Sequence, residues 1–324
     1  MAFRLDVHFL RAISVLAVIL FHANIPFFKN GYLGVDIFFV ISGYLLTNIY
    51  YSNINFSFIS FFTKRAFRIV PSILALVFLL SILFFFFLYP SDYYDFAKSA
   101  FSCLIFLSNF YYFFTENYFD NYNKISLLHT WSVSLEIQLY LIFALTIYYF
   151  KQRSFYIFLI IGFLSFIFFI LDNNARSYYL LTAHSWPFFI GCLIYFARLD
   201  LKKNKAKYLF WLCFLVLTIF IFFPIDLITS YKKLNSLFVV ILVSTIIIVY
   251  KQIRSDYYIN LLLKINIFKY LGNISYSLYL FHYPIFFFNS YLSLSKDSVL
   301  VKILLIFLIF LISHLNHILI EKKF

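Results

Sequence analysis

The stretch Arg11–His22, RAISVLAVILFH, places a cation and an imidazole at the two ends of a segment in which only Ser14 is otherwise polar. In a helix the two side chains would be about three turns plus roughly 20° apart, so they share one face and lie about 16 Å apart along the axis. One group then lies near an edge of the apolar segment and the other deep inside it. The stretch therefore predicts a retained membrane span with a polar face.

The composition extends this prediction to the whole chain. Of the 324 residues, 64% are hydrophobic and 25% are aromatic, which is more apolar surface than the few polar residues of a soluble domain could cover. Apolar runs long enough to cross the roughly 30 Å hydrocarbon layer as helices recur along the sequence. We expect them at 10–28, 31–51, 67–89, 96–114, 131–150, 155–171, 178–198, 207–224, 235–250, 270–293 and 298–319. The sequence predicts an all-α integral membrane protein.

The positive charges predict the orientation of these spans. The most basic loop carries Arg198, Lys202, Lys203, Lys205 and Lys207, and we expect it in the cytoplasm together with both termini. Arg68 and Lys151 are also expected there, which requires an even number of crossings between them although three apolar segments lie in that interval. Segment 96–114 contains several serines and best fits a re-entrant or interfacial segment. The expected fold has about ten transmembrane helices plus this segment.

The charge and the cysteines exclude other classes of protein. The formal net charge is +13, but the cations lie in short loops between apolar runs and form no single patch, so nucleic acid is not an expected partner. Cys103, Cys192 and Cys213 all lie within apolar runs, and an odd number of cysteines fits no complete set of disulfides. We expect buried thiols.

Ionisable side chains inside membrane spans are costly and mark functional sites by default. The candidates are His22, Asp36, His129, Glu136, His184, His282, His314 and His317. On the expected topology the first five lie in the outward half of the membrane. This clustering predicts a polar centre in that half.

One segment offers acid–base chemistry. In HTWSVSLEIQLY, the residues His129, Ser132, Glu136 and Tyr140 follow helical spacing and form one polar stripe. The Glu136 carboxylate needs a partner, and His22 is our candidate, because a carboxylate that orients an imidazole supports general base catalysis. Helical spacing alone leaves open whether the two residues meet.

Two further motifs each have a structural and a chemical interpretation. Asp36, in GYLGVDIFFVISGYLLT, shares a helical stripe with Gly43, where a neighbouring helix can approach closely, and it either holds a loop or takes part in chemistry. In TKRAFRIVP, the cations Lys64, Arg65 and Arg68 at the mouth of the third span form either an ordinary positive-inside flank or a phosphate site.

The last two spans carry the remaining histidines. SYSLYLFHYP places Ser275 and His282 on one helical face, and its tyrosines, including Tyr276, have a spacing that favours packing. His314 and His317 have the spacing of a metal pair, but no nearby carboxylate or thiol accompanies them, so no metal site is expected.

Together these motifs resemble those of the acyltransferase-3 family of bacterial integral-membrane O-acyltransferases. The resemblance covers 1–324 as a single membrane domain, and it rests on Arg11 with His22 and on GYLGVDIFFVISGYLLT, KRAFRIVP, HTWSVSLEIQLY, YLGNISYSLYLFHYP and IEKKF, in that order. The chain departs from the family at His8 and Phe9, where an Asp-Gly pair is common, and at Ile137, where a second carboxylate often follows. Some relatives carry an appended soluble domain, and none is expected here.

The resemblance implies transfer of an acyl group, usually acetyl from acetyl-CoA, to a hydroxyl of an envelope sugar. Lipopolysaccharide O-antigen, capsule and other exopolysaccharides would be acceptors, and the enzyme would lie in the bacterial inner membrane in contact with its lipids. A transporter that flips a lipid-linked saccharide is the alternative, although no inverted repeat is evident.

The resemblance also implies roles for single residues. Catalysis would involve His22, Glu136 and Arg11, and the acyl-CoA phosphates would bind Lys64, Arg65 and Arg68. Support of the substrate or of the structure would come from Asp36, His129, Trp131, Ser42, Tyr276 and His282. Among these, Ser42, Trp131 and Tyr276 are candidate donors to the oxyanion.

Overall fold

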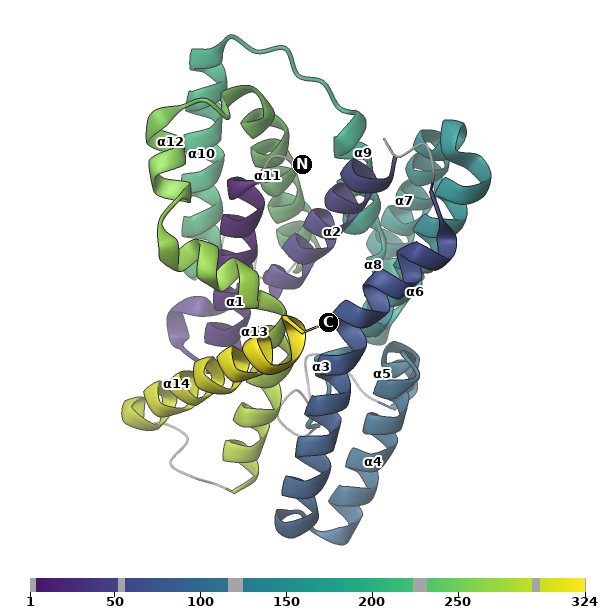
Figure 1. The fold of residues 1–324 in the computed structure, drawn as a ribbon, viewed down its shortest axis with the longest axis vertical. Helices are drawn as coiled ribbons and strands as arrows, with labels where there is room; N and C mark the ends of the chain where they lie inside the picture. The colour runs from purple at the N-terminus through teal and green to yellow at the C-terminus, as the bar shows by residue number, and fades with distance from the viewer. Residues whose placement is uncertain (1–3, 52–55, 116–124, 224–231, 293–297, 324) are drawn as a thin grey trace. The chain divides into compact units, whose positions relative to one another are not determined.

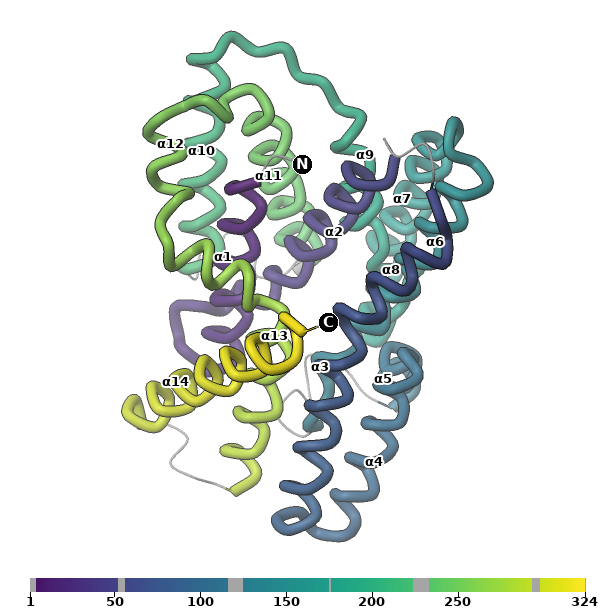
Figure 2. Tube along the Cα trace, viewed as in Figure 1, coloured from purple at the N-terminus to yellow at the C-terminus, as the bar shows by residue number. Residues whose placement is uncertain are grey.

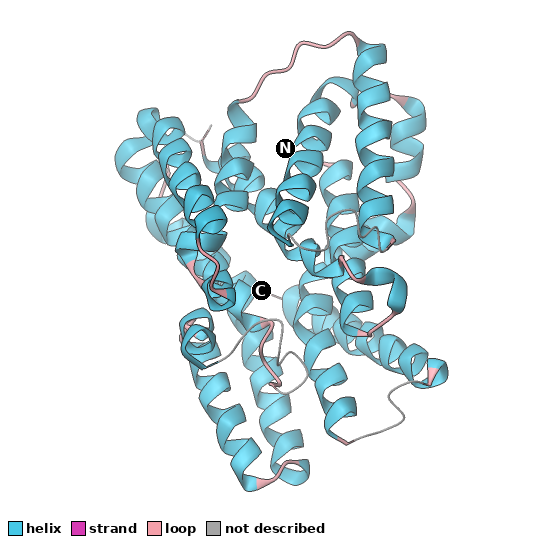
Figure 3. Cartoon of the chain, turned by 180° about the vertical axis from the view of Figure 1, so that it is seen from behind, coloured by secondary structure: helices cyan, strands magenta, loops and turns pink. Residues whose placement is uncertain are grey.

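The structure, a computed structural model, describes residues 4–51, 56–115, 125–223, 232–292 and 298–323. All regular elements within these ranges are helices (Figure 3). The chain divides into two compact units. The first unit comprises Met1–Ile54, Phe150–Ile170 and Ser185–Ser275, and the second comprises Asn55–Tyr149, Leu171–His184 and Tyr276–Phe324.

Seven stretches of the described chain are long and apolar enough to cross a membrane. They are Leu5–His22, Gly31–Tyr50, Phe58–Phe87, Thr130–Leu171, Lys203–Phe222, Lys233–Ile253 and Val299–Glu321. The predicted all-helical class with several apolar helices is confirmed. The finer prediction of about ten spans stays a prediction, because these stretches meet the criteria by length and composition alone.

The first unit is built from both early and late parts of the chain. Its helices are α1 (Leu5–His22), α2 (Gly34–Tyr50), α7 (Ser154–Leu171), α9 (Trp186–Phe196), α10 (Lys203–Phe222), α11 (Lys232–Ile253), α12 (Tyr257–Leu263) and the first part of α13 (Asn266–Tyr291), with the short turns η1 (Pro26–Phe28), η2 (Gly31–Leu33) and η3 (Lys151–Arg153). Helix α10 packs along α11, and α2 packs along α9 (Figures 1 and 2).

Arg11 and His22 lie on the same uninterrupted helix, α1, as predicted. It begins five residues before the expected start at position 10. It ends at His22, before the expected position 28, because Asn24 adopts a left-handed backbone conformation with φ of 52° and Pro26 opens η1. His22 is therefore the last residue of the helix, next to a turn.

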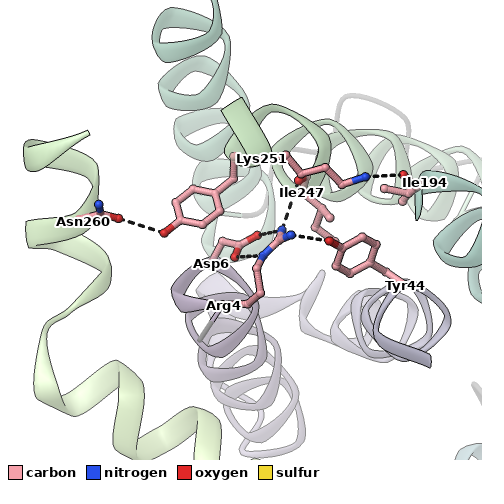
Figure 4. Close-up of polar contacts among 8 residues, drawn as sticks. Arg4, Asp6, Tyr44, Ile194, Ile247, Lys251 and Asn260 are labelled. Carbon is pink, nitrogen blue, oxygen red and sulfur yellow. Dashed lines mark hydrogen bonds and ion pairs between the residues drawn. The ribbon is translucent and has the colours of Figure 1, made fainter. Parts of the chain in front are cut away.

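A buried ion pair anchors the start of α1 (Figure 4). The Arg4 guanidinium donates from Nε to Asp6 Oδ1 at 2.8 Å, and it also donates to the Tyr44 hydroxyl and to the Ile247 carbonyl. Arg4 and Asp6 are 7% and 1% exposed, so these charges are balanced inside the protein. The first turn of α1 is thereby tied to α2 and α11.

Two glycines permit the close packing of α2 on α9. A Cβ atom added at Gly43 would collide with the backbone carbonyl of Phe188, and one added at Gly191 would collide with that of Val40. Each helix thus places its glycine against the backbone of the other. The predicted close approach of a neighbouring helix at Gly43 is confirmed.

The second unit contains the central part of the chain and its C-terminal part. Its helices are α3 (Phe58–Phe87), α4 (Pro90–Leu104), α5 (Ser108–Thr115), α6 (Thr130–Phe150), α8 (Leu181–His184), the second part of α13 and α14 (Val299–Asn316), with the turn η4 (Ala175–Tyr179) and the π-helical turn η5 (His317–Glu321). Cys103 in this unit, and Cys192 and Cys213 in the first, are buried free thiols, as predicted.

Two segments expected as single apolar runs are broken. Segment 96–114 falls into α4 and α5, which are 15 and 8 residues long and meet at Phe106 with φ of 57°, so neither is a candidate span. This break supports the expectation that the segment does not cross.

Segment 178–198, expected to cross, instead contains η4, α8 and the 11-residue α9, with Pro187 in the first turn of α9. A helix of that length extends only about 16 Å.

The contact between α2 and α9 gives the first prediction. Gly191→Ala should lower the free energy of unfolding by about 1–3 kcal/mol, because the added methyl group meets rigid backbone. Thermal unfolding of the purified protein in detergent measures the effect. Gly162→Ala on α7 is the matched control, since its Cβ would meet the side chain of Phe189 and no backbone atom. Equal melting temperatures for both variants would contradict this packing.

Candidate active site

Arg11 is held by α13 within the first unit. Its Nε donates to the Ser275 hydroxyl at 3.1 Å, and that hydroxyl donates to the Gly272 carbonyl at 2.9 Å. A Cβ atom at Gly272 would collide with the backbone of His8, so the glycine allows α13 to approach α1 closely. Ser275, which the sequence placed on a polar face, is therefore the partner that fixes Arg11.

His22 is half-buried at the end of α1. Its Nδ1 lies 3.0 Å from the Val18 carbonyl, one turn back on the same helix. A carbonyl oxygen can only accept, so Nδ1 carries the proton and Nε2 keeps its lone pair in the neutral ring. His22 is thus held in the tautomer that a general base requires.

Asp36 has a structural contact inside the first unit. Its carboxylate is 0% exposed, and Oδ2 accepts a hydrogen bond from the Ser236 hydroxyl at 2.7 Å. This bond joins α2 to α11 and favours the structural interpretation. Ser42 lies half-buried on α2.

The basic cluster and Glu136 come together within the second unit. The Arg65 guanidinium lies 5.7 Å from the centre of the Tyr140 ring, and the Tyr140 hydroxyl donates to Glu136 Oε1 at 2.5 Å. Arg68 also lies within electrostatic range of Tyr140. The predicted stripe on α6 is therefore the face that carries Glu136 and Tyr140, with the arginines of α3 beside it.

Helix α3 is longer than the apolar run predicted at 67–89. It starts at Phe58, after the Ser57 cap, so Lys64, Arg65 and Arg68 lie about 9 to 15 Å along the helix from its first residue. Because its 30 residues exceed the length needed to cross the hydrocarbon layer, the expected place of these cations at the mouth of the third span stays a prediction. Lys64 and Arg68 are exposed, whereas Arg65 is half-buried.

His129 and His282 form a buried aromatic cluster in the second unit. His129 Nε2 donates to the Leu280 carbonyl at 3.0 Å, and its ring lies 5.5 Å from that of His282. His282 Nδ1 donates to the Tyr279 carbonyl at 2.6 Å. The bond from His129 joins the start of α6 to α13, whereas the bond of His282 lies within α13. The supporting role predicted for both histidines stays a prediction.

The remaining aromatic candidates, Trp131 and Tyr276, also have contacts within the second unit. Trp131 is 1% exposed, and its ring lies 5.4 Å from that of His184, which in turn lies 4.3 Å from the ring of Tyr178. The Tyr276 hydroxyl donates to the Ile69 carbonyl at 3.1 Å. The Tyr276 hydroxyl therefore already donates to the backbone, and the prediction that Trp131 and Tyr276 donate to an oxyanion stays a prediction.

The structure adds a polar network at the end of α14, the α14 polar cluster, which consists of Ser72, Ser277, Ser313, Asn316, His317 and Glu321. His317 Nδ1 lies 2.6 Å from Glu321 Oε2, and the Ser277 hydroxyl donates to Glu321 Oε1 at 2.6 Å. The expectation that no carboxylate joins His317 is wrong, because the π-helical turn η5 brings Glu321 to it. The spacing of four residues was the available signal.

His22 and Glu136 belong to different compact units, so their expected pairing stays a prediction. The first unit brings together Arg11 and Ser275 and positions His22 at the end of the same helix. The second unit brings together Glu136, Tyr140 and Arg65. Both arrangements place ionisable groups on apolar helices, where such groups mark function.

Comparison with known proteins shows the family. The sequence profile of the family described as "Acyltransferase domain" matches residues 4–315. This chain belongs to that family. The resemblance found in its motifs is confirmed, and the match covers both compact units.

The curated relatives carry the names of O-acetyltransferases. The chain is 30% identical to the O-acetyltransferase OatA of Staphylococcus aureus (strain NCTC 8325 / PS 47), over 96% of this chain and 55% of the relative. It is 28% identical to the peptidoglycan O-acetyltransferase OatA of Listeria monocytogenes, over 85% and 48%, and 29% identical to the putative peptidoglycan O-acetyltransferase YrhL of Bacillus subtilis, over 85% and 47%. The chain spans about half the length of these relatives. No solved structure matches it.

The hydrogen bond to Glu136 gives a prediction for the second unit. Tyr140→Phe should lower the rate of acyl transfer about 10-fold, because the carboxylate loses a charged hydrogen bond while the ring that contacts Arg65 remains. Tyr148→Phe is the matched control, since Tyr148 is 55% exposed on the same helix. Initial rates of purified variants measure the effect. Equal rates for the two variants would show that Tyr140 is only a packing residue.

Proposed function

We propose that the protein is a membrane O-acyltransferase that moves an acetyl group from acetyl-CoA to a hydroxyl of an envelope glycan. The observation that carries this proposal is the tautomer of His22, whose Nδ1 proton is held by the Val18 carbonyl at the end of a helix that also carries Arg11. An imidazole in that state is ready to accept a proton at Nε2.

The proposed reaction is direct transfer. The acceptor oxygen attacks the thioester carbonyl carbon as its proton passes to His22 Nε2. The carbon–sulfur bond then breaks, and the departing thiolate takes up a proton to give the free thiol of CoA. Glu136 is proposed to support the positive charge on His22, and Arg11, held by Ser275, is proposed to position the reacting groups.

The donor site is proposed on α3. Arginine forks match phosphate oxygens in geometry and charge, and Arg65 and Arg68 lie one turn apart on the same face of that helix. Lys64, which is exposed, adds a third cation.

The acceptor is proposed from the relatives. Two of them are named peptidoglycan O-acetyltransferases, one as putative, so peptidoglycan is the first acceptor to test. Lipopolysaccharide O-antigen and capsule are the other envelope glycans that fit the same chemistry. Mass spectrometry of all three, from cells with and without the gene, would identify the acceptor by its lost acetyl group. The proposed location is the bacterial cytoplasmic membrane, with both termini in the cytoplasm.

The test of this proposal is turnover by the purified protein. His22→Ala should lower the rate of acetyl-CoA consumption in the presence of acceptor by about 10² to 10⁴, the usual contribution of a general base. His314→Ala, a half-buried histidine on α14, is the control and should stay near the wild-type rate. Full activity of a well-folded His22→Ala protein would reject the assignment. Glycolipid translocation without loss of thioester would favour a transporter instead.

A further inference from the structure

Two atoms of the α14 polar cluster have no hydrogen-bond partner within the part of the chain that the structure describes. They are the hydroxyl of Ser313, which is 0% exposed, and Oδ1 of Asn316, which is 6% exposed. Ser313 and Asn316 lie three residues apart on α14 and therefore share a face of the helix. Buried polar groups are nearly always paired in native proteins, so these two require an explanation.

The network around Asn316 fixes which of its amide atoms is unpaired. The Ser277 hydroxyl has one proton, which it donates to Glu321, so its oxygen accepts the bond of 2.7 Å from Asn316 Nδ2. Nδ2 also donates to the Ser72 hydroxyl at 3.0 Å. Both amide protons are thus used, and Oδ1 is left as an acceptor whose orientation the two serines determine.

His317 lies next to these two residues, with its Nδ1 2.6 Å from Glu321 Oε2. Ser313 and Asn316 therefore present a hydroxyl and an amide oxygen within about one turn of α14. A ligand that matches them has N–H and O–H donors.

The position of this face relative to the arginines of α3 narrows the class of ligand. Ser72, which binds Asn316, follows Arg68 by four residues and Arg65 by seven on α3, which is about 6 Å and 10 Å along the helix. Resting on the proposed function, we infer that the α14 polar cluster binds the pantetheine arm of the acyl-CoA donor. That arm has two amide N–H groups and one hydroxyl, and its first amide lies about 7 Å beyond the diphosphate, two residue lengths of an extended chain.

The residue types of the α14 polar cluster indicate which part of CoA it binds, the pantetheine arm or the phosphates. Ser313 and Asn316 are uncharged and His317 lies against the Glu321 carboxylate, so the cluster lacks the arginine forks that bind phosphate. In this proposal Arg65 and Arg68 bind the phosphates of CoA, and the α14 polar cluster binds its uncharged pantetheine arm. The two halves of CoA should therefore depend on different residues.

The test compares two fragments of CoA as competitors of labelled CoA on the purified full-length chain. Pantetheine represents the arm, and adenosine 3′,5′-bisphosphate represents the nucleotide. Ser313→Ala and Asn316→Leu should weaken pantetheine about 3- to 10-fold, the loss of one hydrogen bond, and leave the bisphosphate unchanged. Arg68→Gln should weaken the bisphosphate and leave pantetheine unchanged.

Folding and the matched control are measured on the same samples. Ser313→Ala removes an unpaired buried hydroxyl, so the melting temperature without ligand should stay equal or rise. Ser81→Ala on α3 removes a hydroxyl that donates to the Val77 carbonyl, and it should affect neither fragment. Unchanged affinities in both α14 variants, or equal losses for both fragments, would overturn the inference. A wild-type protein that binds no CoA at all would instead refute the proposed donor.

Discussion

Polar side chains inside these helices have to be paired within the protein, because the hydrocarbon around the apolar helices offers no hydrogen-bond partner. The bond from Arg11 to Ser275 is one such pairing within the first unit. It joins α1 to α13 where Gly272 allows the two backbones to approach. The Arg4–Asp6 pair fixes the start of the same helix. Helix α1 therefore has polar contacts at Arg4 and at Arg11, both before its last residue, His22.

The same constraint explains which features the sequence could predict. Long apolar runs and the spacing of Arg11 and His22 depend on local periodicity, and α1 and the close approach at Gly43 follow from it. The need for an even number of crossings predicted that segment 96–114 does not span, but it did not predict the break between α4 and α5 near Phe106. The start of α3 was missed because FISFF before Lys64 was too short to appear as a span, although Ser57 caps the helix there.

Pairings between distant segments were less accessible. Nothing in the spacing of Arg4 indicates that it is buried with Asp6 and Tyr44, since an arginine before an apolar run also marks a cytoplasmic flank. Glu321 was counted with the C-terminal charges, and its bond to His317 depends on a π-helical turn that periodicity does not predict. Asn316 became informative only when both serine partners of its amide were known. Sequence patterns therefore predicted individual helices better than the polar contacts between them.

We propose that the base lies on α1, the phosphate site on α3 and the site of the pantetheine arm on α14. We also propose that the thioester comes from the cytoplasmic side of the membrane and the acceptor alcohol from the opposite side. Sealed vesicles containing the purified protein test this directly, with acetyl-CoA enclosed and a soluble glycan acceptor outside. Acetyl esters should appear outside while free thiol appears inside, and both should stop in the His22→Ala protein. Transfer that occurs only when donor and acceptor are on the same side would contradict this proposal.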